Sequence, residues 1–236
     1  MPLKHIQLKK ITIAIDGFSS TGKSTVAKQL AKHLGYIYVD TGAMYRAVTL
    51  FAMQQGFIDK DHFNVDKLIA ALDNITISFK FNETAGFAEV YLNGVNIEKE
   101  IRTLEVSQFV SQVAAVSEVR SQLVKQQQQM GKDKGVVMDG RDIGTVVFPD
   151  AELKLFMIAS ADKRAQRRFD ELINRGDKVS FEEVLKNVED RDYVDSHRED
   201  SPLRKADDAI EIDNSDLDLE SQFKKVLELV NTKFSN

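Results

Sequence analysis

Residues 11–25 read Ile-Thr-Ile-Ala-Ile-Asp-Gly-Phe-Ser-Ser-Thr-Gly-Lys-Ser-Thr, and the rest of the chain is organised around this stretch. Its second half fits, without a mismatch, the pattern Gly, any four residues, Gly-Lys-Ser/Thr. The β-branched side chains Ile11, Ile13 and Ile15 precede this pattern, and such a run favours a short buried strand. The motif therefore follows a predicted strand directly.

A helix is predicted on the other side of the motif. Val26, Leu30 and Leu34 recur every fourth residue, which places them on one helical face. Gly35 then supplies a helix stop. Because the loop joins a strand to a helix, the first backbone N–H groups of that helix can turn toward a polyphosphate.

This context predicts a nucleoside triphosphate site. Gly17 and Gly22 let the backbone approach phosphate oxygens in conformations that a side chain would forbid. We expect Lys23 to reach the β- and γ-phosphates and the Ser24 hydroxyl to ligate Mg²⁺. A serine-rich turn that happens to precede a helix is the competing interpretation, but strand, loop and helix all agree with the motif. The predicted triphosphate-binding residues are Gly17, Ser19, Ser20, Thr21, Gly22, Lys23, Ser24 and Thr25.

The composition narrows the class of protein. The 236 residues can bury a full core, most simply as one domain with a small insert. Lys and Arg number 32 against 37 Asp and Glu, and the net charge of −5 argues against a non-specific nucleic-acid binder. The absence of cysteine excludes disulfides and fits a reducing cytosol. The first ten residues lack the apolar run of a signal peptide, and no apolar run of about eighteen residues predicts a membrane span.

A second strand is predicted at residues 36–39, and it leads into Asp-Thr-Gly-Ala-Met-Tyr-Arg at 40–46 and then a helix. Strand, helix and strand in this order predict a parallel sheet with right-handed crossovers. Ligands bind beyond the carboxyl ends of such strands, so Gly17 and Thr41 are expected at the ligand-binding edge. Arg46 points to the same edge, although a solvated surface charge is the alternative interpretation.

Residues 66–103 follow a different pattern. Apolar and polar residues alternate with a period of two over 75–81, and an apolar face recurs over 88–92. A turn is predicted at 82–86, and Asn93-Gly94 is a strong hairpin signal before a third short strand at 95–97. The pattern predicts a small antiparallel sheet inserted between parallel strands, either a mobile lobe over a second substrate or a passive decoration.

After the insert, residues 105–130 are predicted to be helical, with a break at Ser117 that caps a new helix. Three more strands are predicted at 135–138, 153–158 and 209–212. The first of these opens into Asp-Gly-Arg-Asp-Ile-Gly at 139–144. Two carboxylates and an arginine at a strand end are unusual for a loop without a ligand; an internally paired turn is the alternative.

Two charged helices are predicted between the last two strands. Arg164, Arg167 and Arg168 share one helical face, and a capping box at 180–183 begins the second helix. On that helix Arg191, Asp195 and Arg198 are predicted to share a face. Such arginines are often solvated, but beside a triphosphate they are candidates for clamping a transferring phosphate. A final amphipathic helix at 217–234 is assigned to packing.

We therefore predict an α/β fold of the P-loop NTPase type, a five-stranded parallel sheet flanked by helices with a small inserted antiparallel sheet. Nearly end to end, the chain resembles the bacterial cytidylate kinases, members of the nucleoside monophosphate kinase group. The resemblance rests on motifs at 16–25, 40–46, 100–103, 111–115, 139–150 and 201–209. The phosphate loop is shared by many families, whereas Asp-Gly-Arg-Asp-Ile-Gly-Thr-Val-Val at 139–147 with the inserted sheet is far more specific.

The resemblance implies transfer of the γ-phosphoryl group of ATP to CMP or dCMP, with Mg²⁺ and without a covalent intermediate. It implies a kinase core at 1–65 and 104–236 with a lid near 164–180, and a monophosphate-binding lobe at 66–103. We expect a cytoplasmic monomer that binds neither nucleic acid nor membranes. The rivals are a kinase for another small molecule, which would lack the insert and the second arginine face, and a P-loop switch. The guanine-reading Asn-Lys-x-Asp element is absent, which disfavours a switch.

Matching motif positions, the resemblance also implies roles for individual residues. The implied monophosphate contacts are Arg46, Arg141 and Arg198; the sugar contacts are Ser111, Arg191 and Asp195; the base contacts are Thr41, Arg120 and Asp142, and Tyr45 completes the substrate-binding set. The implied catalytic residues are Lys23, Arg141 and Arg198 together with the lid arginines Arg164 and Arg167. Phe18 departs from the small residue or proline expected after Gly17, so it is expected to alter neighbouring contacts rather than phosphate binding.

Overall fold

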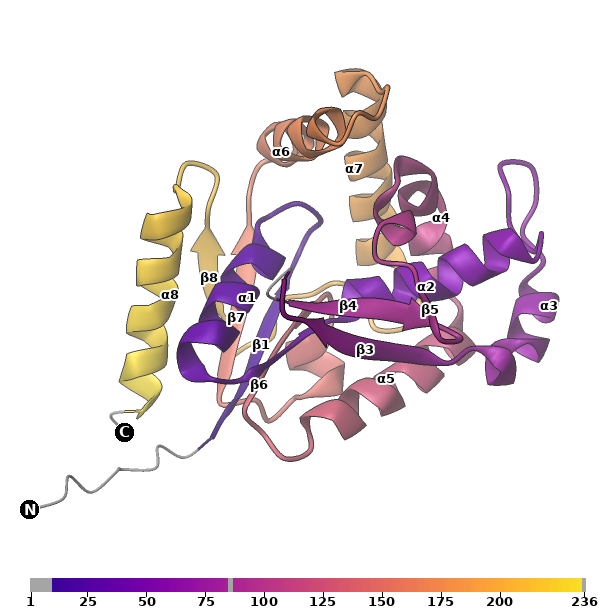
Figure 1. Ribbon diagram of the computed structural model, residues 1–236. Helices are drawn as coiled ribbons and strands as arrows, with labels where there is room; N and C mark the ends of the chain where they lie inside the picture. The colour runs from indigo at the N-terminus through magenta and orange to yellow at the C-terminus, as the bar shows by residue number, and fades with distance from the viewer. Residues whose placement is uncertain (1–9, 85–86, 235–236) are drawn as a thin grey trace, which may run out of the picture.

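The computed structural model describes residues 10–84 and 87–234. Its centre is a five-stranded parallel sheet in the order β2-β6-β1-β7-β8 (Figure 1). The strands are β1 (Thr12–Gly17), β2 (Ile37–Asp40), β6 (Val136–Gly140), β7 (Leu153–Ile158) and β8 (Ile210–Asp213). The predicted fold class is confirmed, and the phosphate loop leaves the central strand of the sheet.

Side chains on the two faces of the sheet enter different apolar clusters, because they alternate along each strand. On one face Ile13 and Ile15 pack against α1 (Lys23–Leu34) and α8 (Leu219–Phe234). On the other face Ala14 packs with Ile143 and Val147 of a short π-helical segment, η3 (Ile143–Val147). The sequence predicted a loop here, so this segment is a correction. Apolar helices on both faces explain why the strands read as almost continuously hydrophobic.

The inserted sheet has the order β3-β4-β5, with strands β3 (Ile77–Asn82), β4 (Phe87–Leu92) and β5 (Val95–Asn96). A short helix, α3 (Val65–Ala70), precedes it. The sheet packs into the same apolar cluster as α2 (Thr41–Gln54) and α4 (Leu104–Ala114), through Ile77 and Val90 among others. The antiparallel insert is thereby confirmed; of the turn predicted at 82–86, residues 85–86 lie outside the described residues.

Helix boundaries correct the sequence prediction at two places. Thr103 caps α4 by accepting the Val106 N–H, whereas Ser117 is the first residue of α5 (Ser117–Gly131) rather than its cap. The capping box that begins α7 (Phe181–His197) is present as predicted, between Ser180 and Glu183. Arg198 lies just beyond the end of α7 rather than on it, and its guanidinium still lies 3.8 Å from the Asp195 carboxylate.

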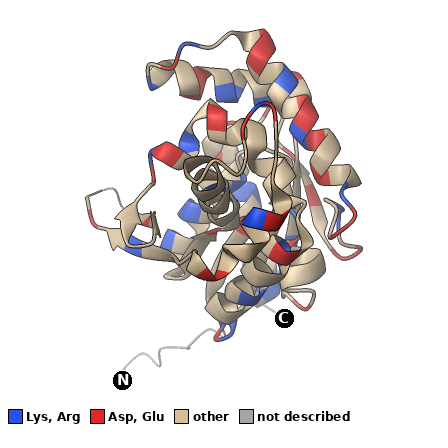
Figure 2. Cartoon of the chain, turned by 90° about the vertical axis from the view of Figure 1, so that its right-hand side faces the viewer, with Lys and Arg blue, Asp and Glu red and all other residues tan. Residues whose placement is uncertain are grey.

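Helices α6 (Ala161–Asn174) and α7 stand above the carboxyl ends of the parallel strands (Figure 1). Lys, Arg, Asp and Glu residues are frequent along both helices (Figure 2). Only a few apolar residues, among them Ala165, Leu172, Val184 and Val188, hold the two helices together. Within residues 10–84 and 87–234, no helix has the length and apolar character needed to cross a bilayer.

Candidate active site

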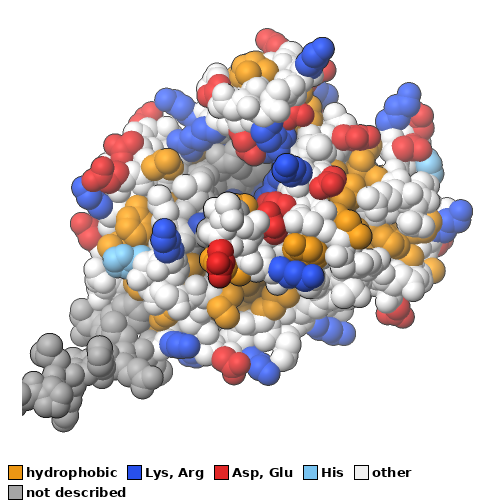
Figure 3. Space-filling model, in the orientation of Figure 1, with side chains coloured by type: hydrophobic (Ala, Val, Ile, Leu, Met, Phe, Trp, Pro, Cys, Tyr) orange, Lys and Arg blue, Asp and Glu red, His pale blue; other side chains and the backbone are white. Residues whose placement is uncertain are grey.

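A cleft of about 1250 Å³ opens at the carboxyl edge of the parallel sheet. The surface is hollowed beneath α6 and α7, with Lys and Arg side chains at its rim (Figure 3). The predicted site residues that line this cleft are Ser19, Ser20, Thr21, Gly22, Lys23, Ser24, Thr25, Thr41, Tyr45, Arg46, Ser111, Arg120, Arg141, Asp142, Arg167, Arg191, Asp195 and Arg198. Of the predicted set, all of which the structure describes, Gly17 and Arg164 lie outside the lining.

The two loop glycines serve different purposes. Gly22, with a φ of 89°, is the residue before α1 and lines the cleft. Gly17 has a φ of 143°, and a Cβ atom there would lie 2.1 Å from the carbonyl oxygen of Met157 on β7. Close packing of the sheet therefore requires a glycine at position 17, and the predicted approach to a phosphate there stays a prediction.

Lys23 lies under the phosphate loop and is almost wholly buried. Its ammonium donates to the carbonyl oxygen of Phe18 at 2.5 Å and to the Thr21 hydroxyl at 3.3 Å. Burial, and then the nearby Arg141 guanidinium, lower the pKa of Lys23 to about 7. An anion entering the loop would favour the charged ammonium, so this lysine is arranged to respond to a polyphosphate.

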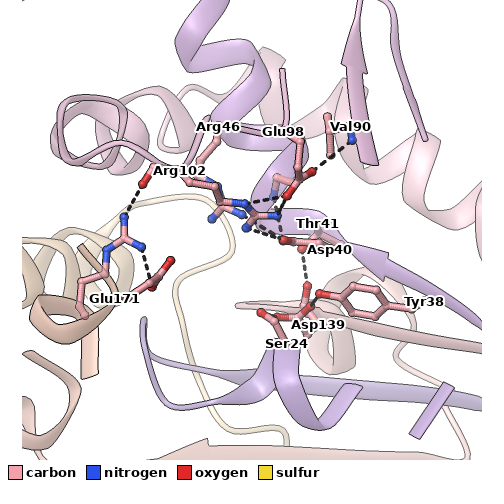
Figure 4. A network of polar contacts seen from close by, with 12 residues as sticks. Ser24, Tyr38, Asp40, Thr41, Arg46, Val90, Glu98, Arg102, Asp139 and Glu171 are labelled. Carbon is pink, nitrogen blue, oxygen red and sulfur yellow. Dashed lines mark hydrogen bonds and ion pairs between the residues drawn. The ribbon is translucent and has the colours of Figure 1, made fainter. Parts of the chain in front are cut away.

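Asp139, at the end of β6, joins the phosphate loop to the second strand (Figure 4). Its carboxylate accepts the Ser24 hydroxyl at 3.0 Å and the Tyr38 hydroxyl at 2.8 Å, and its carbonyl oxygen accepts the Thr41 hydroxyl at 2.7 Å. Burial, reinforced by the charge of Asp40, raises the pKa of Asp139. The buried Asp139 carboxylate and the Ser24 hydroxyl beside it together offer oxygen ligands of the kind that Mg²⁺ prefers.

Asp40, which pairs with Asp139 in the register of β2 and β6, gathers two arginines at the cleft (Figure 4). It caps α2 by accepting the Ala43 N–H, and it accepts Arg46 at 3.1 Å and Arg102 at 2.9 Å. Arg102 comes from the end of the insert, where Glu98 also holds it at 2.8 Å. Although burial opposes ionisation, Arg46 and Arg102 hold the pKa of Asp40 far below its usual range.

Asp195 organises a second charged group, between α4 and α7. It accepts the Ser111 hydroxyl at 3.1 Å and the Arg141 guanidinium at 2.9 Å, and Arg198 lies 3.8 Å away. Arg191, on the same helix, donates to the Ser107 hydroxyl at 2.9 Å. Although burial opposes ionisation, the charges of Arg141 and then Arg191 lower the pKa of Asp195. Arg141, from the neighbouring loop, is the cation that hydrogen-bonds Asp195 directly.

Two of the predicted base-reading residues, Arg120 and Asp142, form a buried pair in the lining of the cleft. Arg120 of α5 donates to Asp142 and, at 3.1 Å, to the carbonyl oxygen of Ala114. The guanidinium carbon also lies 5.4 Å from the ring centroid of Tyr45. Thr41 reaches the same region from the start of α2, where its hydroxyl is occupied by the Asp139 carbonyl.

The two predicted lid arginines are held in place by different partners. Arg164 is buried against Asp192 of α7, donates to the Ser19 carbonyl oxygen at 3.3 Å and lies 5.2 Å from the Phe18 ring centroid. Arg167 lines the cleft and donates at 2.7 Å to both the side chain and the carbonyl oxygen of Asn214. In this arrangement Arg164 braces the loop from outside the cleft.

Sequence reasoning assigned no role to Asp139, Arg102 or Asn214. Asn214 is buried and donates to the Thr21 carbonyl oxygen at 2.6 Å, so it supports the phosphate loop. Asp139 and Asn214 both lie at the carboxyl ends of parallel strands, the edge where ligands bind, and that position was the available signal. Arg102 is part of the 100–103 motif, but nothing local to that motif identifies Asp40 as its partner.

Comparison with known proteins identifies the family. The family model described as cytidylate kinase matches residues 13–232. A cytidylate kinase of Flavobacterium johnsoniae is 72% identical over 224 residues, covering 95% of this chain and 97% of its own. One of Flavobacterium psychrophilum is 68% identical, covering 95% and 99%, and one of Bacteroides thetaiotaomicron is 60% identical, covering 91% and 94%. This chain belongs to the cytidylate kinase family.

Proposed function

We propose that this protein transfers the γ-phosphoryl group of ATP to CMP or dCMP and releases ADP and CDP or dCDP. The observation that carries the proposal is the layout of one cleft. The phosphate loop and the buried Arg120–Asp142 pair line the same cleft, together with Arg46, Arg141, Arg191 and Arg198. Such a cleft suits a triphosphate facing a monophosphate.

Crowding of positive charge supports a phosphate-binding role for these arginines. Burial, and then the neighbouring Arg141, lower the pKa of Arg191 to about 9. Burial also lowers the pKa of Arg46 to about 10, and Arg102 and Arg168 add to that lowering. A phosphate dianion placed among these groups would relieve their mutual repulsion, which favours binding of an anionic acceptor.

The donor end supplies a position for Mg²⁺. The Ser24 hydroxyl and the Asp139 carboxylate lie 3.0 Å apart and face the loop, so hard oxygen donors are available. We propose that these two residues hold the ion together with the phosphates of ATP. When bound, Mg²⁺ would neutralise part of the charge on the β- and γ-phosphates.

Positioning and charge account for the transfer itself. Lys23 and Arg167 would contact the donor phosphates, while Arg46, Arg141 and Arg198 would hold the acceptor phosphate so that its oxygen attacks in line. Arg168 and Arg175 at the lid both donate at 2.8 Å to the carbonyl oxygen of Arg102 in the insert. This contact between lid and insert supports closure over both substrates, which would exclude water and limit wasteful hydrolysis.

One chain supplies every side chain in this scheme, so we propose that the enzyme works as a monomer, in the cytoplasm. We also propose that residues 66–103 act as the acceptor lobe and 164–180 as the lid of a core formed by 1–65 and 104–236.

A coupled assay of ADP formation, run with ATP and a panel of nucleoside monophosphates, tests the proposed reaction. CMP and dCMP should give the highest kcat/KM, with UMP below them and purine monophosphates inactive. Formation of ADP that does not depend on any pyrimidine monophosphate would overturn it.

A further inference from the structure

Asp16 is a buried carboxylate that the proposed reaction does not use. It is the residue before Gly17 at the end of β1, its exposed fraction is 5%, and it does not line the cleft. One carboxylate oxygen accepts the backbone N–H of Ile143 at 2.8 Å, and the other accepts that of Gly144 at 2.7 Å. Two consecutive N–H groups therefore meet the two oxygens of one side chain.

Burying this group is costly, which argues that its hydrogen bonds are retained for a purpose. Burial raises the pKa of Asp16 to about 7 even though both backbone N–H groups lower it. Lys23 is the nearby cation that lowers it further, while the charge of Asp142 raises it. Lys154 of β7 lies on the same side, but its ammonium donates to Asp208 at 2.9 Å instead.

The two N–H groups belong to a segment that carries acceptor-binding side chains. Ile143 begins η3 and comes directly after Arg141 and Asp142. Arg141 reaches Asp195, and Asp142 reaches Arg120, so both side chains depend on where this backbone lies. Asp16 is thus a direct link between the strand that leads into the phosphate loop and the backbone that carries these two residues.

We propose that Asp16 is a positioning residue that aligns Arg141 and Asp142 with the phosphate loop. The inference rests on the proposed function, because it assigns the aligned residues to binding of CMP. Asp16 touches neither substrate in this scheme. Its main effect on affinity is therefore expected at the acceptor site, through the 141–144 backbone, with a smaller one at the ATP site through its charge on Lys23.

The test is to measure dissociation constants for CMP and for ATP separately by calorimetry in the unmodified enzyme and in Asp16→Asn. Asparagine keeps the shape but turns one acceptor into a donor, so one buried N–H loses its partner. The segment relieves this conflict by shifting, and we expect CMP to bind roughly tenfold more weakly or worse. The dissociation constant for ATP should change much less, because Asp16 acts on that site only through its charge, which favours the ammonium form of Lys23.

Glu152→Gln is the matched control. Glu152 accepts the N–H of Thr12 at 2.9 Å at the opposite end of β1, and neither residue lines the cleft. The substitution removes the same kind of charge from the same kind of bond. It should leave both dissociation constants unchanged, whatever it does to thermal stability.

A second variant perturbs the same bond from its other partner. In Gly144→Ala the added Cβ would lie 3.3 Å from the Asp16 carboxylate and 3.1 Å from the Lys154 side chain, so the carboxylate or the lysine must shift by a few tenths of an ångström. Binding of CMP should again weaken selectively. The double variant, Asp16→Asn with Gly144→Ala, should bind CMP no worse than Asp16→Asn alone. If Asp16→Asn does not fold, Gly144→Ala decides the question by itself.

The outcomes separate the two proposals. If the unmodified enzyme binds CMP and the folded variants bind it equally well, the role of Asp16 is wrong and the proposed function stands. Equal weakening of CMP and ATP likewise overturns the inference, because it indicates a general structural role. If the unmodified enzyme neither binds nor phosphorylates CMP, the proposed function fails, and this inference fails with it.

Discussion

The Arg120 guanidinium donates to the Asp142 carboxylate although both residues have exposed fractions of only 3%. Two opposite charges are therefore paired in the lining of the cleft before any base is bound. Asp142 pairs with Arg120, while Arg141 pairs with Asp195, so the Asp142 carboxylate does not serve to brace Arg141. Ready-made donors and an acceptor at this place suit discrimination between pyrimidine bases.

Asp142→Ala should reduce the preference for CMP over UMP. Cytosine offers an amino donor to the carboxylate, whereas uracil presents a carbonyl of like polarity. Mispairing buried polar groups costs on the order of 1–3 kcal/mol each, so kcat/KM for CMP should fall roughly tenfold to a hundredfold, and that for UMP much less. Both values should be measured for the variant, with exposed Asp150→Ala as control. An unchanged ratio of the two would remove Asp142 from base recognition.

Lys23→Ala should leave the fold intact and nearly abolish phosphoryl transfer. The ammonium bonds only to atoms of its own loop, Phe18 and Thr21, among the contacts described for it, so few tertiary contacts are lost. Turnover should fall roughly a hundredfold to a thousandfold or more, as for other preorganised charge-stabilising donors. Thermal unfolding and ADP formation should be followed together. Lys32→Ala, an exposed change on the same helix, is the control, and near-normal turnover in folded Lys23→Ala would contradict the assignment.

Binding of ATP should be accompanied by proton uptake at neutral pH. In the free enzyme, burial and Arg141 lower the pKa of Lys23 to about 7, so this group is only partly charged there. Triphosphate oxygens favour the ammonium form and raise that pKa. Affinity for ATP should therefore fall as the pH rises from 7 toward 9, by up to about tenfold for each pH unit.

Calorimetry at pH 7 in two buffers that differ in ionisation enthalpy measures this uptake directly. Lys23→Met should lose most of it while remaining folded. If the unmodified enzyme binds ATP with no buffer dependence of the enthalpy and no change of affinity up to pH 9, Lys23 is already charged in the empty loop.

Asp195→Ala should lower kcat/KM for CMP and for dCMP together. Asp195 accepts both Ser111 and Arg141, so its removal affects the proposed sugar contact and also leaves the buried Arg141 guanidinium without its carboxylate. Leaving one member of a buried ion pair without its partner costs up to several kcal/mol of free energy. We therefore expect kcat/KM to fall by roughly a hundredfold with either acceptor. Asp190→Ala, exposed on the same helix, is the comparison. Kinetics with both acceptors that match the unmodified enzyme would exclude Asp195 from the site.

The sequence alone determined the features that depend on neighbouring residues. The strand before Gly17, the helix after Gly22, the capping box at Ser180 and the Asn93-Gly94 hairpin are all present, because each depends on local periodicity or on one side chain reaching nearby backbone. The order of these elements also predicted the parallel sheet, since short connections leave few topologies. The edge of the sheet that carries the site followed from that topology.

Only the tertiary structure decided which charged groups meet. Ser24 and Asp139 are 115 residues apart in sequence, Asp40 and Arg102 are 62 apart, and Arg141 and Asp195 are 54 apart. No local pattern distinguishes Arg141 from Arg191 as the partner of Asp195, because both carry the same charge. Packing makes that choice, because it brings the residue after β6 within reach of α7. Once the Asp195 carboxylate is buried it needs a cationic partner, and Arg141 is the cation that the backbone places within hydrogen-bonding distance.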